Sequence, residues 1–421
     1  MHILHINFSD RHQGGGGAIA MYRLHQGLID LGVESHILCH RKTLPGSEST
    51  LHPAPTRRDR LAQRLTQRLG LNDIHNLSTF KIQDLPAYQW ADVLNLHIIH
   101  SNYFNYLALP ELTRTKPAVF TLHDMWAFTG HCVYSFGCDR WKIGCGHCPD
   151  LNLPLQIRRD ASAWDWKLKR WAYKQSHLAI VCPSQWLTDL ARQSLLKGLP
   201  ISPIANGLDL TVYRPLDSAA CRRFLGLPGD RPILLYVAAN PADYRKGFDL
   251  WIQAIQRLPP AVKSDLLLLV MGSRSAEEQL QALEIEVVHL GYVEYEPLKV
   301  MVYSAADLFV FPTRADNLPL VIQESLACGT PVVSFRVGGV PDMVKSGQTG
   351  YLAEPENVED LANGIAQLLE DSTLRQQLSR QSRQWSEAEY ALPLQAQRYH
   401  ALYQNLLAGH SSHLNNHEVS P

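Results

Sequence analysis

Short apolar segments recur along the chain and alternate with segments long enough to form helices. They are rich in Val, Ile and Leu, and they read MHILHINF, ESHILC, ADVLNLHII, AVFTLHD, LAIVCPS, PILLYVAAN, DLLLLVMG, IEVVHLG, ADLFVFPT and TPVVSF. Strands that are apolar on both faces and are separated by helices are typical of parallel sheets covered by helices on both sides. Because the segments fall into two series, the pattern predicts an α/β protein with two Rossmann-like domains.

The two series are separated near PIANGLDLTVYRPLD, where Asn206, Gly207 and Pro215 favour a linker over a regular element. We therefore expect an N-terminal domain at residues 1–203 and a C-terminal domain at residues 204–385. Residues 386–409 are expected to form a helix that packs back toward the N-terminal domain. The polar residues 410–421 are expected to form a disordered tail.

Composition narrows the class of protein. Hydrophobic residues make up 45% of the 421 residues, which excludes disordered and collagen-like chains. The N-terminus lacks a basic leader followed by a long apolar run, and no run of 18 apolar residues occurs. We therefore expect a cytoplasmic protein that does not span a membrane.

The two halves of the chain differ in charge, although the net charge is only −1. Residues 1–200 carry 22 Lys and Arg against 15 Asp and Glu, whereas residues 201–421 carry 17 against 25. A basic first half suits an anionic partner such as a membrane surface or a phosphorylated lipid. A chance imbalance between two surfaces is the alternative.

The segment RADNLPLVIQESLACGTPVVSF carries two carboxylates around a predicted helix. Pro319 suits the first turn of that helix and Gly329 suits its end, so the helix is expected at residues 318–328. Asp316 then lies on the loop that enters the helix, and Glu324 lies within it. Since strands flank the segment on both sides, the loop is at the carboxyl end of a strand, where open α/β sheets bind ligands.

Two further loops follow strands and suit anionic ligands. The run Gly14 to Gly17 precedes a helix, so its backbone N–H groups suit an anion or a sugar oxygen, although a simple tight turn is the alternative. Arg245 and Lys246 follow the strand LLYVAAN and suit a diphosphate, although a solvated basic pair is the alternative. Dinucleotide binding is disfavoured because the second strand ends in Cys39 and His40 and not in an acidic residue.

Three segments in order resemble the C-terminal domain of the family 4 retaining glycosyltransferases. They are RKGFDLWIQA, FVFPTRADNLPLVIQESLACGTPVVSF and VGGVPDMVKSGQTGYLAEPENVEDLANGI. With the N-terminal glycine run and the linker NGLDLTVY, the resemblance covers nearly the whole chain. It implies the GT-B fold, in which two Rossmann-like domains face each other across a cleft. It also implies transfer of a hexosyl-type sugar from a nucleotide diphosphate sugar, with retention at the anomeric carbon.

The resemblance assigns roles to individual residues. Glu324 matches the residue that contacts the ribose, and Asp316 matches the residue near the donor sugar, with a shorter side chain than the family's usual Glu. Lys246 matches the lysine that holds the leaving phosphate. Pro241 stands where the family usually has an Arg, and Arg245 is expected to replace that Arg.

His123 at the end of AVFTLH matches a histidine that contacts the donor sugar, although a structural histidine is the alternative. The expected catalytic residues are Asp316, His123 and Lys246; the expected donor-binding residues are Gly15, Gly16, Arg245, Lys246, Asn317, Leu318 and Glu324; Asp124 is expected on the acceptor side. No metal or other cofactor is expected in catalysis, and no nucleic acid is expected as a partner. The departing phosphate oxygen is expected to accept the acceptor's proton.

The segment HDMWAFTGHCVYSFGCDRWKIGCGHCPDL forms a predicted Cys-rich loop at residues 131–149, and it resembles a subgroup of bacterial exopolysaccharide glycosyltransferases of the colanic-acid type. Its cysteines are Cys132, Cys138, Cys145 and Cys148, and their spacing is C-x5-C-x6-C-x2-C. In a reducing cytoplasm this density favours a structural zinc ion over disulfides. Free thiols are a further alternative. A zinc ion here would shape the acceptor loop and take no part in the chemistry.

Two basic segments of the first half suit the headgroup layer of an anionic membrane. TRRDRLAQRLTQRLGL has leucines and arginines at helical spacing, and WDWKLKRWAYK interleaves tryptophans with cations. They favour a protein on the inner face of the membrane that uses a glycan or lipid-linked acceptor, as in exopolysaccharide synthesis. Packing of Trp164, Trp166 and Trp171 in the core is the alternative.

Three other functions share these features. A phosphorylase or an epimerase with the GT-B fold would have the same sheets and phosphate-binding residues. A nucleotide-sugar-binding module without catalytic activity is favoured by Pro241 and opposed by the presence of Lys246, Asp316 and Glu324.

Overall fold

The chain folds into two compact units. The computed structural model describes residues 1–421 except 12–14, 45, 274–276 and 418–421. The N-terminal unit comprises Met1–Gly207 together with the chain from Leu392 onward, and the C-terminal unit is Leu208–Ala391. The division after Gly207 lies within the linker expected from the sequence.

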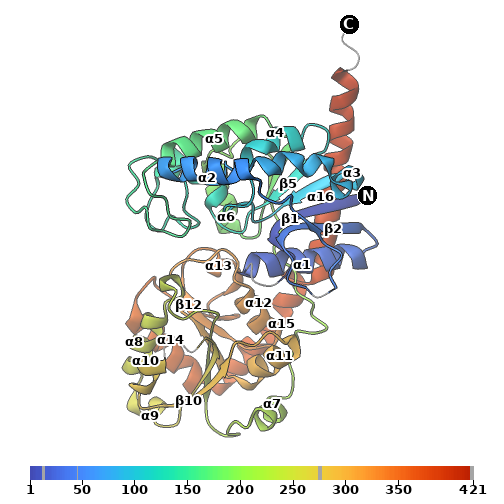
Figure 1. Ribbon diagram of the computed structural model, residues 1–421. Coiled ribbons are helices and arrows are strands. Elements are labelled where there is room, and N and C mark those ends of the chain that lie inside the picture. The colour runs from blue at the N-terminus through green and yellow to red at the C-terminus, as the bar shows by residue number, and fades with distance from the viewer. Residues whose placement is uncertain (12–14, 45, 274–276, 418–421) are drawn as a thin grey trace. The chain divides into compact units, whose positions relative to one another are not determined.

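The N-terminal unit is built on a sheet of parallel strands (Figure 1). In spatial order the strands are β3 (Thr50–Leu51), β2 (Glu34–Arg41), β1 (His2–Ser9), β4 (Val93–Leu96), β5 (Ala118–Thr121), β6 (Leu178–Cys182) and β7 (Ile201–Pro203). β1 is central because it pairs with β2 on one side and with β4 on the other. Its interior residues are buried, as expected for a strand covered on both faces.

Helices cover both faces of this sheet. One face carries α1 (Gly15–Asp30) and α16 (Leu392–His417), whose side chains share a core with Ile3, Val93 and Val119. The remaining helices are α2 (Arg57–Leu69), α3 (Pro86–Trp90), α4 (Leu109–Leu112), α5 (Ser162–Lys174) and α6 (Gln185–Gln193), with short 3-10 turns at Leu77–Asp84, Tyr106–Ala108, Trp126–Phe128 and Arg140–Lys142.

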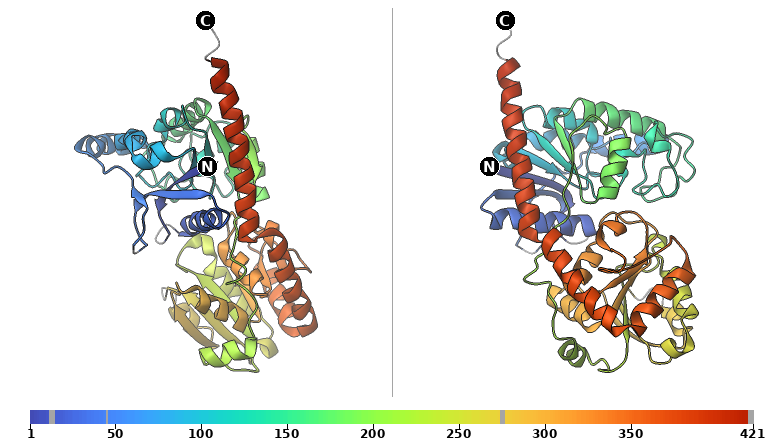
Figure 2. Two further views of the ribbon diagram at one scale, coloured as in Figure 1. Left: turned by 90° about the vertical axis from the view of Figure 1, so that its right-hand side faces the viewer. Right: turned by 180° about the vertical axis from the view of Figure 1, so that it is seen from behind.

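The long helix α16 completes the N-terminal unit although it is the last element of the chain (Figure 2). Tyr403 accepts a hydrogen bond of 2.7 Å from the Asn95 amide, and the hydroxyls of Tyr399 and Thr121 lie 3.0 Å apart. A buried amide and hydroxyl of the sheet thus find partners on this helix. The expected helix does pack on this unit, but it begins at Leu392 and not at residue 386.

The predicted disordered tail differs from the structure over most of its length. α16 continues to His417, so the backbone of residues 410–417 is helical, and residues 418–421 lie outside the described residues. The polarity of the segment misled the prediction, because a helix whose earlier turns are packed needs little from its last turns to continue.

The C-terminal unit is a second parallel sheet. Its strands, in spatial order, are β10 (Glu286–Gly291), β9 (Leu267–Gly272), β8 (Ile233–Ala238), β11 (Leu308–Phe311), β12 (Val332–Phe335) and β13 (Gly350–Ala353). The strand order reverses between β8 and β11, which are hydrogen-bonded neighbours. Such a switch point leaves room for a ligand beyond the carboxyl ends of the two strands.

Helices cover both faces of the second sheet as well. α8 (Phe248–Arg257) and α14 (Val358–Glu370) contact each other and share a core with β8 and β9. α11 (Glu296–Ala305) contacts α7 (Ser218–Leu225) and α12 (Leu320–Ala327), and α12 contacts α15 (Ser372–Glu389). Short helices are α9 (Pro260–Lys263), α10 (Glu277–Gln281) and α13 (Val340–Met343). In the described part of the chain, no helix is both long and apolar enough to pass through a bilayer.

The N-terminal unit buries several histidines. His5 on β1 lies 3.0 Å (Nδ1) from Nε2 of His97, and Nδ1 of His97 lies 3.0 Å from Nε2 of His123. Burial lowers the pKa of His123, His25 and His52 to about 4 and the pKa of His5 and His97 well below the usual value of 6.5. These imidazoles are therefore neutral in the folded protein at neutral pH.

We expect the N-terminal unit to lose stability in mild acid. A histidine whose folded pKa is depressed binds its proton only in the unfolded chain, so stability is complete above the unfolded pKa of 6.5 and falls as the pH drops toward 4. Each such histidine removes about 1.4 kcal/mol of stability per pH unit in that window. Urea unfolding followed by tryptophan fluorescence between pH 7.5 and 4.5 measures this slope.

The C-terminal unit supplies the internal control, because residues 208–391 contain a single histidine, His289. Replacing His52 with Gln should flatten the slope for the N-terminal unit. An identical slope in the unaltered protein and in the His52→Gln variant would contradict the assignment of a neutral buried imidazole at His52.

Candidate functional site

The loop that carries Asp316 connects β11 to α12. The helix is shorter than predicted and runs from Leu320 to Ala327, with Pro319 as the N-cap residue and not inside the first turn. Gly329 follows the helix with φ +75, the left-handed conformation that ends helices most easily when the residue is glycine. Pro319 and Gly329 therefore set the two ends of α12. Asp316 lies on the loop between the carboxyl end of β11 and this helix.

Arg245 and Lys246 lie beyond the carboxyl end of the neighbouring strand β8, in a 3-10 turn at Tyr244–Lys246. Lys246 Nζ donates to Asp316 Oδ2 at 2.8 Å, and Arg245 Nη1 donates to the same oxygen at 2.9 Å. Asp316 is 13% exposed, and the two cations are 21% and 23% exposed. Asp316 and Lys246, two of the three expected catalytic residues, therefore form one cluster of charges with Arg245, and this cluster has access to solvent.

The cluster pairs two cations with two carboxylates, because Arg245 Nη2 also lies 3.2 Å from Asp243 Oδ2. Burial alone would raise the pKa of Asp316, but the charges of Lys246 and Arg245 outweigh it and lower that pKa below its usual value. The carboxyl group is therefore ionised at neutral pH, and the two cations face two carboxylates. The Lys246 ammonium has three donor hydrogens, which suits a ligand that brings negative charge.

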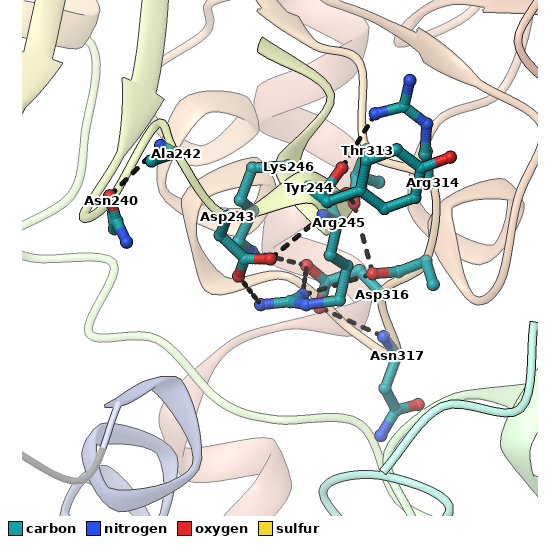
Figure 3. A network of polar contacts seen from close by, with 11 residues as sticks. Asn240, Ala242, Asp243, Tyr244, Arg245, Lys246, Thr313, Arg314, Asp316 and Asn317 are labelled. Atoms are coloured by element: carbon teal, nitrogen blue, oxygen red, sulfur yellow. Dashed lines mark hydrogen bonds and ion pairs between the residues drawn. The ribbon is translucent and has the colours of Figure 1, made fainter. Parts of the chain in front are cut away.

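The β11–α12 loop also holds the backbone of the cationic turn (Figure 3). Thr313 donates its hydroxyl to the carbonyl of Arg245 at 2.9 Å, and the backbone N–H of Arg314 donates to the same carbonyl at 2.8 Å. The Arg314 side chain donates to the carbonyl of Tyr244 and lies over its ring, 3.9 Å from the centroid. Arg314 is itself held by two hydrogen bonds to Asp249.

Gly247 allows the two loops to meet. It has φ +65, and a side-chain carbon at this position would lie 1.8 Å from the carbonyl oxygen of Pro312. Only glycine fits both the conformation and the contact. The turn at Tyr244–Lys246 is thus held against the end of β11 by contacts of its backbone as well as by its charges.

Glu324 lies on the buried face of α12 and is 3% exposed. It accepts a hydrogen bond of 3.3 Å from the hydroxyl of Tyr303 on α11. Its recorded partner is thus different from those of Asp316, although both were predicted to contact the donor. Asn317 and Leu318 between them are buried, and the Asn317 N–H donates to Asp316 Oδ1 at 3.1 Å.

In the N-terminal unit, His123 follows β5 and stacks on His97, with ring centroids 5.3 Å apart. Gly17 of α1 lies close to His123, because a side-chain carbon at this position would be 3.0 Å from Cγ of His123. Of the expected glycines, Gly15 opens α1 with φ +69 and Gly16 follows in its first turn, whereas Gly14 lies outside the described residues. The glycine run therefore lets the start of α1 approach the histidine.

Asp124 is held by two donors. His100 Nε2 lies 3.1 Å from Asp124 Oδ2, and the N–H of Trp126 donates to Oδ1 at 2.8 Å. Burial alone would raise the pKa of Asp124, but these partners lower it, so the group is an anion. His97, His100, His123 and Asp124 line a cavity of about 10 Å³.

The four clustered cysteines are free thiols that line a second small cavity together with His131. Within the described ranges, no three His, Cys, Asp or Glu side chains already have the arrangement of a metal site. The expected zinc ion therefore stays a prediction.

Sequence reasoning missed His97, His100 and Tyr303 as parts of these sites, and it named Gly17 in the glycine run without foreseeing its contact with His123. The sequence did indicate His97 and His100, because both follow a predicted strand in LNLHIIH. Side chains after the carboxyl end of such a strand are candidates for ligand binding. Tyr303 has no such signal, since only the packing of α11 on α12 brings it to Glu324.

Comparisons with known proteins agree with these two units. The family model described as "Glycosyltransferase Family 4" matches residues 14–212, and the model described as "Glycosyl transferases group 1" matches residues 217–385. The putative colanic acid biosynthesis glycosyl transferase WcaC of Escherichia coli K12 is 28% identical over 95% of this chain and 99% of its own length. The expected resemblance to colanic-acid type enzymes is thereby confirmed.

Solved structures show the same fold. Sucrose-phosphate synthase from Thermosynechococcus elongatus matches 97% of this chain and 100% of its own, with a TM-score of 0.70 and 20% identity. Anabaena HepE in complex with UDP-glucose matches 96% of this chain and 100% of its own, with a TM-score of 0.68 and 16% identity. The solved structures show the GT-B fold, and the two family matches, which together cover most of the chain, show that it belongs to the family 4, group 1 glycosyltransferases.

Proposed function

We propose that this glycosyltransferase moves a hexose from a nucleotide diphosphate sugar to a glycan or lipid-linked acceptor, with retention at the anomeric carbon. The observation that carries the proposal is the cluster in which Lys246 and Arg245 share Asp316 beyond the ends of β8 and β11. Exopolysaccharide synthesis is the proposed setting, because the relative WcaC is named for colanic acid biosynthesis and aligns along nearly its whole length.

The cationic cluster suits the diphosphate of the donor. An ammonium has three donor hydrogens and a guanidinium has five, so both side chains suit phosphate oxygens beside the carboxylates of Asp316 and Asp243. As the bond to the sugar breaks, negative charge grows on the leaving phosphate, and a preorganised pair of cations stabilises that charge. Arg245 takes the place of the family's usual Arg, at whose position this chain has Pro241.

The two carboxylates serve different parts of the donor. Asp316, held at the mouth of the site by both cations, suits a hydroxyl of the sugar, whereas Glu324 suits the vicinal hydroxyls of the ribose because it offers two oxygens. HepE, a structural neighbour, was solved with UDP-glucose, and the same class of donor is proposed here. The acceptor's proton passes to the departing phosphate oxygen, so no protein base is assigned.

His123 is proposed to donate a hydrogen bond to the donor sugar, with Asp124 on the acceptor side. A neutral imidazole has a single N–H, and the chain of contacts from His5 through His97 determines which nitrogen of His123 carries it. Because His5 Nε2 is buried without a recorded partner, it suits an acceptor better than an N–H. His123 then carries its proton on Nδ1.

The first prediction of the proposal concerns donor binding. Unfolding temperatures measured with UDP, GDP, ADP and their sugars should rise for one base series. Glu324→Gln should weaken that binding about 10- to 100-fold, the effect of losing a charged hydrogen bond of about 1.5–3 kcal/mol. Gln keeps an acceptor for the hydroxyl of Tyr303, so the fold is preserved. Glu370→Gln, on the exposed end of α14, is the matched control.

The base series found in this way is then used in a transfer assay. A glycosylated product with the donor's anomeric configuration supports the proposal. Release or uptake of phosphate sugar would point to a phosphorylase, and interconversion of sugars would point to an epimerase. Donor binding without any turnover on lipid-linked or glycan acceptors would favour the non-catalytic module.

A second prediction separates the diphosphate from the nucleoside. Lys246→Ala should reduce affinity for the nucleoside diphosphate at least tenfold and leave affinity for the free nucleoside unchanged, because Lys246 contacts charge and not the base. Isothermal titration with both ligands measures this difference. Lys263→Ala on α9 of the same unit is the control. Equal losses for the two ligands would remove Lys246 from the diphosphate site.

We also propose that the protein is cytoplasmic and binds the inner face of an anionic membrane through α2 and α5. Leu61, Leu65 and Leu69 on α2 are 61%, 56% and 57% exposed, although Thr56 and Asp59 form a capping box that fixes the helix. An ordered helix that displays leucines beside arginines suits a headgroup layer. The exposed arginines on α2 are Arg57, Arg58, Arg60, Arg64 and Arg68.

The tryptophans of α5 divide between surface and core. Trp164 and Trp171 are 65% and 53% exposed, and Lys167 and Arg170 on the same helix are exposed too. Trp166 is buried, and its indole N–H donates to the carbonyl of Trp141, so the alternative of core packing holds for this residue. Exposed indoles beside cations suit the membrane interface.

The third prediction concerns this surface. Reversing Arg60, Arg64 and Arg68 to Glu should reduce binding to vesicles of anionic lipid more than 100-fold at low salt, since each basic residue near the surface contributes about 1 kcal/mol. Sedimentation with vesicles measures the bound fraction. Donor binding should be unchanged in this variant.

The matched control reverses Arg257, Lys263 and Arg336 in the C-terminal unit and should sediment like the unaltered protein. Equal sedimentation of both variants, or of vesicles with and without anionic lipid, would contradict a docking surface on α2.

A further inference from the structure

The Cys-rich loop encloses a space the size of a single ion. Its cavity has a volume of about 20 Å³, which is room for one water-sized particle. All four cysteines of the loop and His131 line it. Since the thiols are free, the loop folds around this point without covalent links.

The backbone of the loop is strained where its last two cysteines turn inward. Cys145 and His147 have φ +54 and +49, and Gly146 between them has φ +86. Non-glycine residues in this region are uncommon, and two of them in one turn persist only where the surroundings demand it. The N–H of Gly146 donates to Ser162 at 3.0 Å, which anchors the turn to the start of α5.

We propose that Cys132, Cys138, Cys145 and Cys148 bind one zinc ion in this cavity. Soft thiolates in a set of four select zinc, and the pair Cys145–Cys148 has the two-residue spacing of zinc turns. The thiols of the free protein stand around the cavity but not yet at coordinating positions, so the ion draws them together. Each thiol gives its proton to solvent as its sulfur binds.

Two neighbouring groups suit the charge of the centre. A zinc ion with four thiolates carries a charge of about −2. Nε2 of His131 lies 3.3 Å from Sγ of Cys148, where an N–H would donate to the thiolate. Burial raises the pKa of Cys132 to about 11 and that of Cys145 to about 12, and the positive charge of the buried Lys169 opposes this rise.

The centre is tied to the loop that carries Asp124. Lys169 Nζ donates to the carbonyls of Trp126 at 2.8 Å and Thr129 at 3.1 Å, and it lies 3.7 Å from the ring centroid of Trp126. The N–H of Trp126 in turn donates to Asp124. The zinc ion therefore has a structural role: it fixes the segment after β5, and with it the position of Asp124. This consequence for Asp124 rests on the proposed function, whereas zinc binding itself does not.

The first test is the metal content of the full chain, purified without an affinity tag and dialysed against metal-free buffer. Elemental analysis should find one zinc per chain. Cys138→Ser and Cys148→Ser should lose it, whereas Cys221→Ser, which removes a buried cysteine of the C-terminal unit, should keep it. Cobalt added to the metal-free chain should give the visible absorption of tetrahedral cobalt bound by thiolates.

Two outcomes would overturn zinc binding. Metal-free protein with eight reactive thiols after denaturation would show free cysteines. Metal-free protein with fewer reactive thiols, restored by a reductant, would show disulfides.

The second test concerns the order of the loop. Removal of zinc with a chelator should speed trypsin cleavage after Arg140, Lys142 or Arg158 at least tenfold, and added zinc should reverse the effect. Nucleotide binding should persist in the chelated protein, because the cationic cluster lies in the C-terminal unit. Equal cleavage with and without zinc would overturn the structural role. Failure of nucleotide binding in the zinc-loaded protein would count against the proposed function instead.

Discussion

The ion pairs that Asp316 makes with Lys246 and Arg245 depend on one feature of topology, the adjacency of β8 and β11. These strands are distant in sequence, and each sends its following loop over the same edge of the sheet because the strands are parallel. A carboxylate on one loop then meets two cations on the other. The arrangement holds only while the backbones meet, which Gly247 permits and Thr313 and Arg314 enforce. The order of the strands in the sheet therefore determines where the candidate donor site lies.

The sequence predicted the strands well because burial on both faces leaves a plain signal. All ten apolar segments became strands, and the three other strands of the described chain, β3, β7 and β13, lie outside these segments. β3 has only two residues, and β13 begins at Gly350, where a side-chain carbon would lie 1.9 Å from the carbonyl of Val332. Very short strands and strands that need a glycine for close approach carry little apolar pattern. Helix ends were less well predicted, as Pro319 shows by standing at the N-cap and not within the first turn.

Within the candidate site, residues with a local signature were found and residues placed by packing were not. Arg245, Lys246 and Asp316 each follow a strand, so their grouping could be inferred from position alone. The hydrogen bond from Tyr303 to Glu324 depends on how α11 packs on α12, and no spacing in the sequence encodes it. The same holds for Gly17, whose contact with His123 needs the start of α1 to lie beside the end of β5.

The two units carry different kinds of polar groups beyond the carboxyl ends of their strands. The C-terminal unit keeps its polar groups charged, with two cations beside two carboxylates, and such cations suit a ligand that arrives with negative charge. The N-terminal unit keeps His5, His97 and His123 neutral with their ring nitrogens in contact, so these three side chains offer directed hydrogen bonds without charge beside the anionic Asp124. A sugar is neutral and rich in hydroxyls, whereas a diphosphate is an anion. Each set of side chains therefore suits one class of chemical group, and the strands of its sheet decide where that group is recognised.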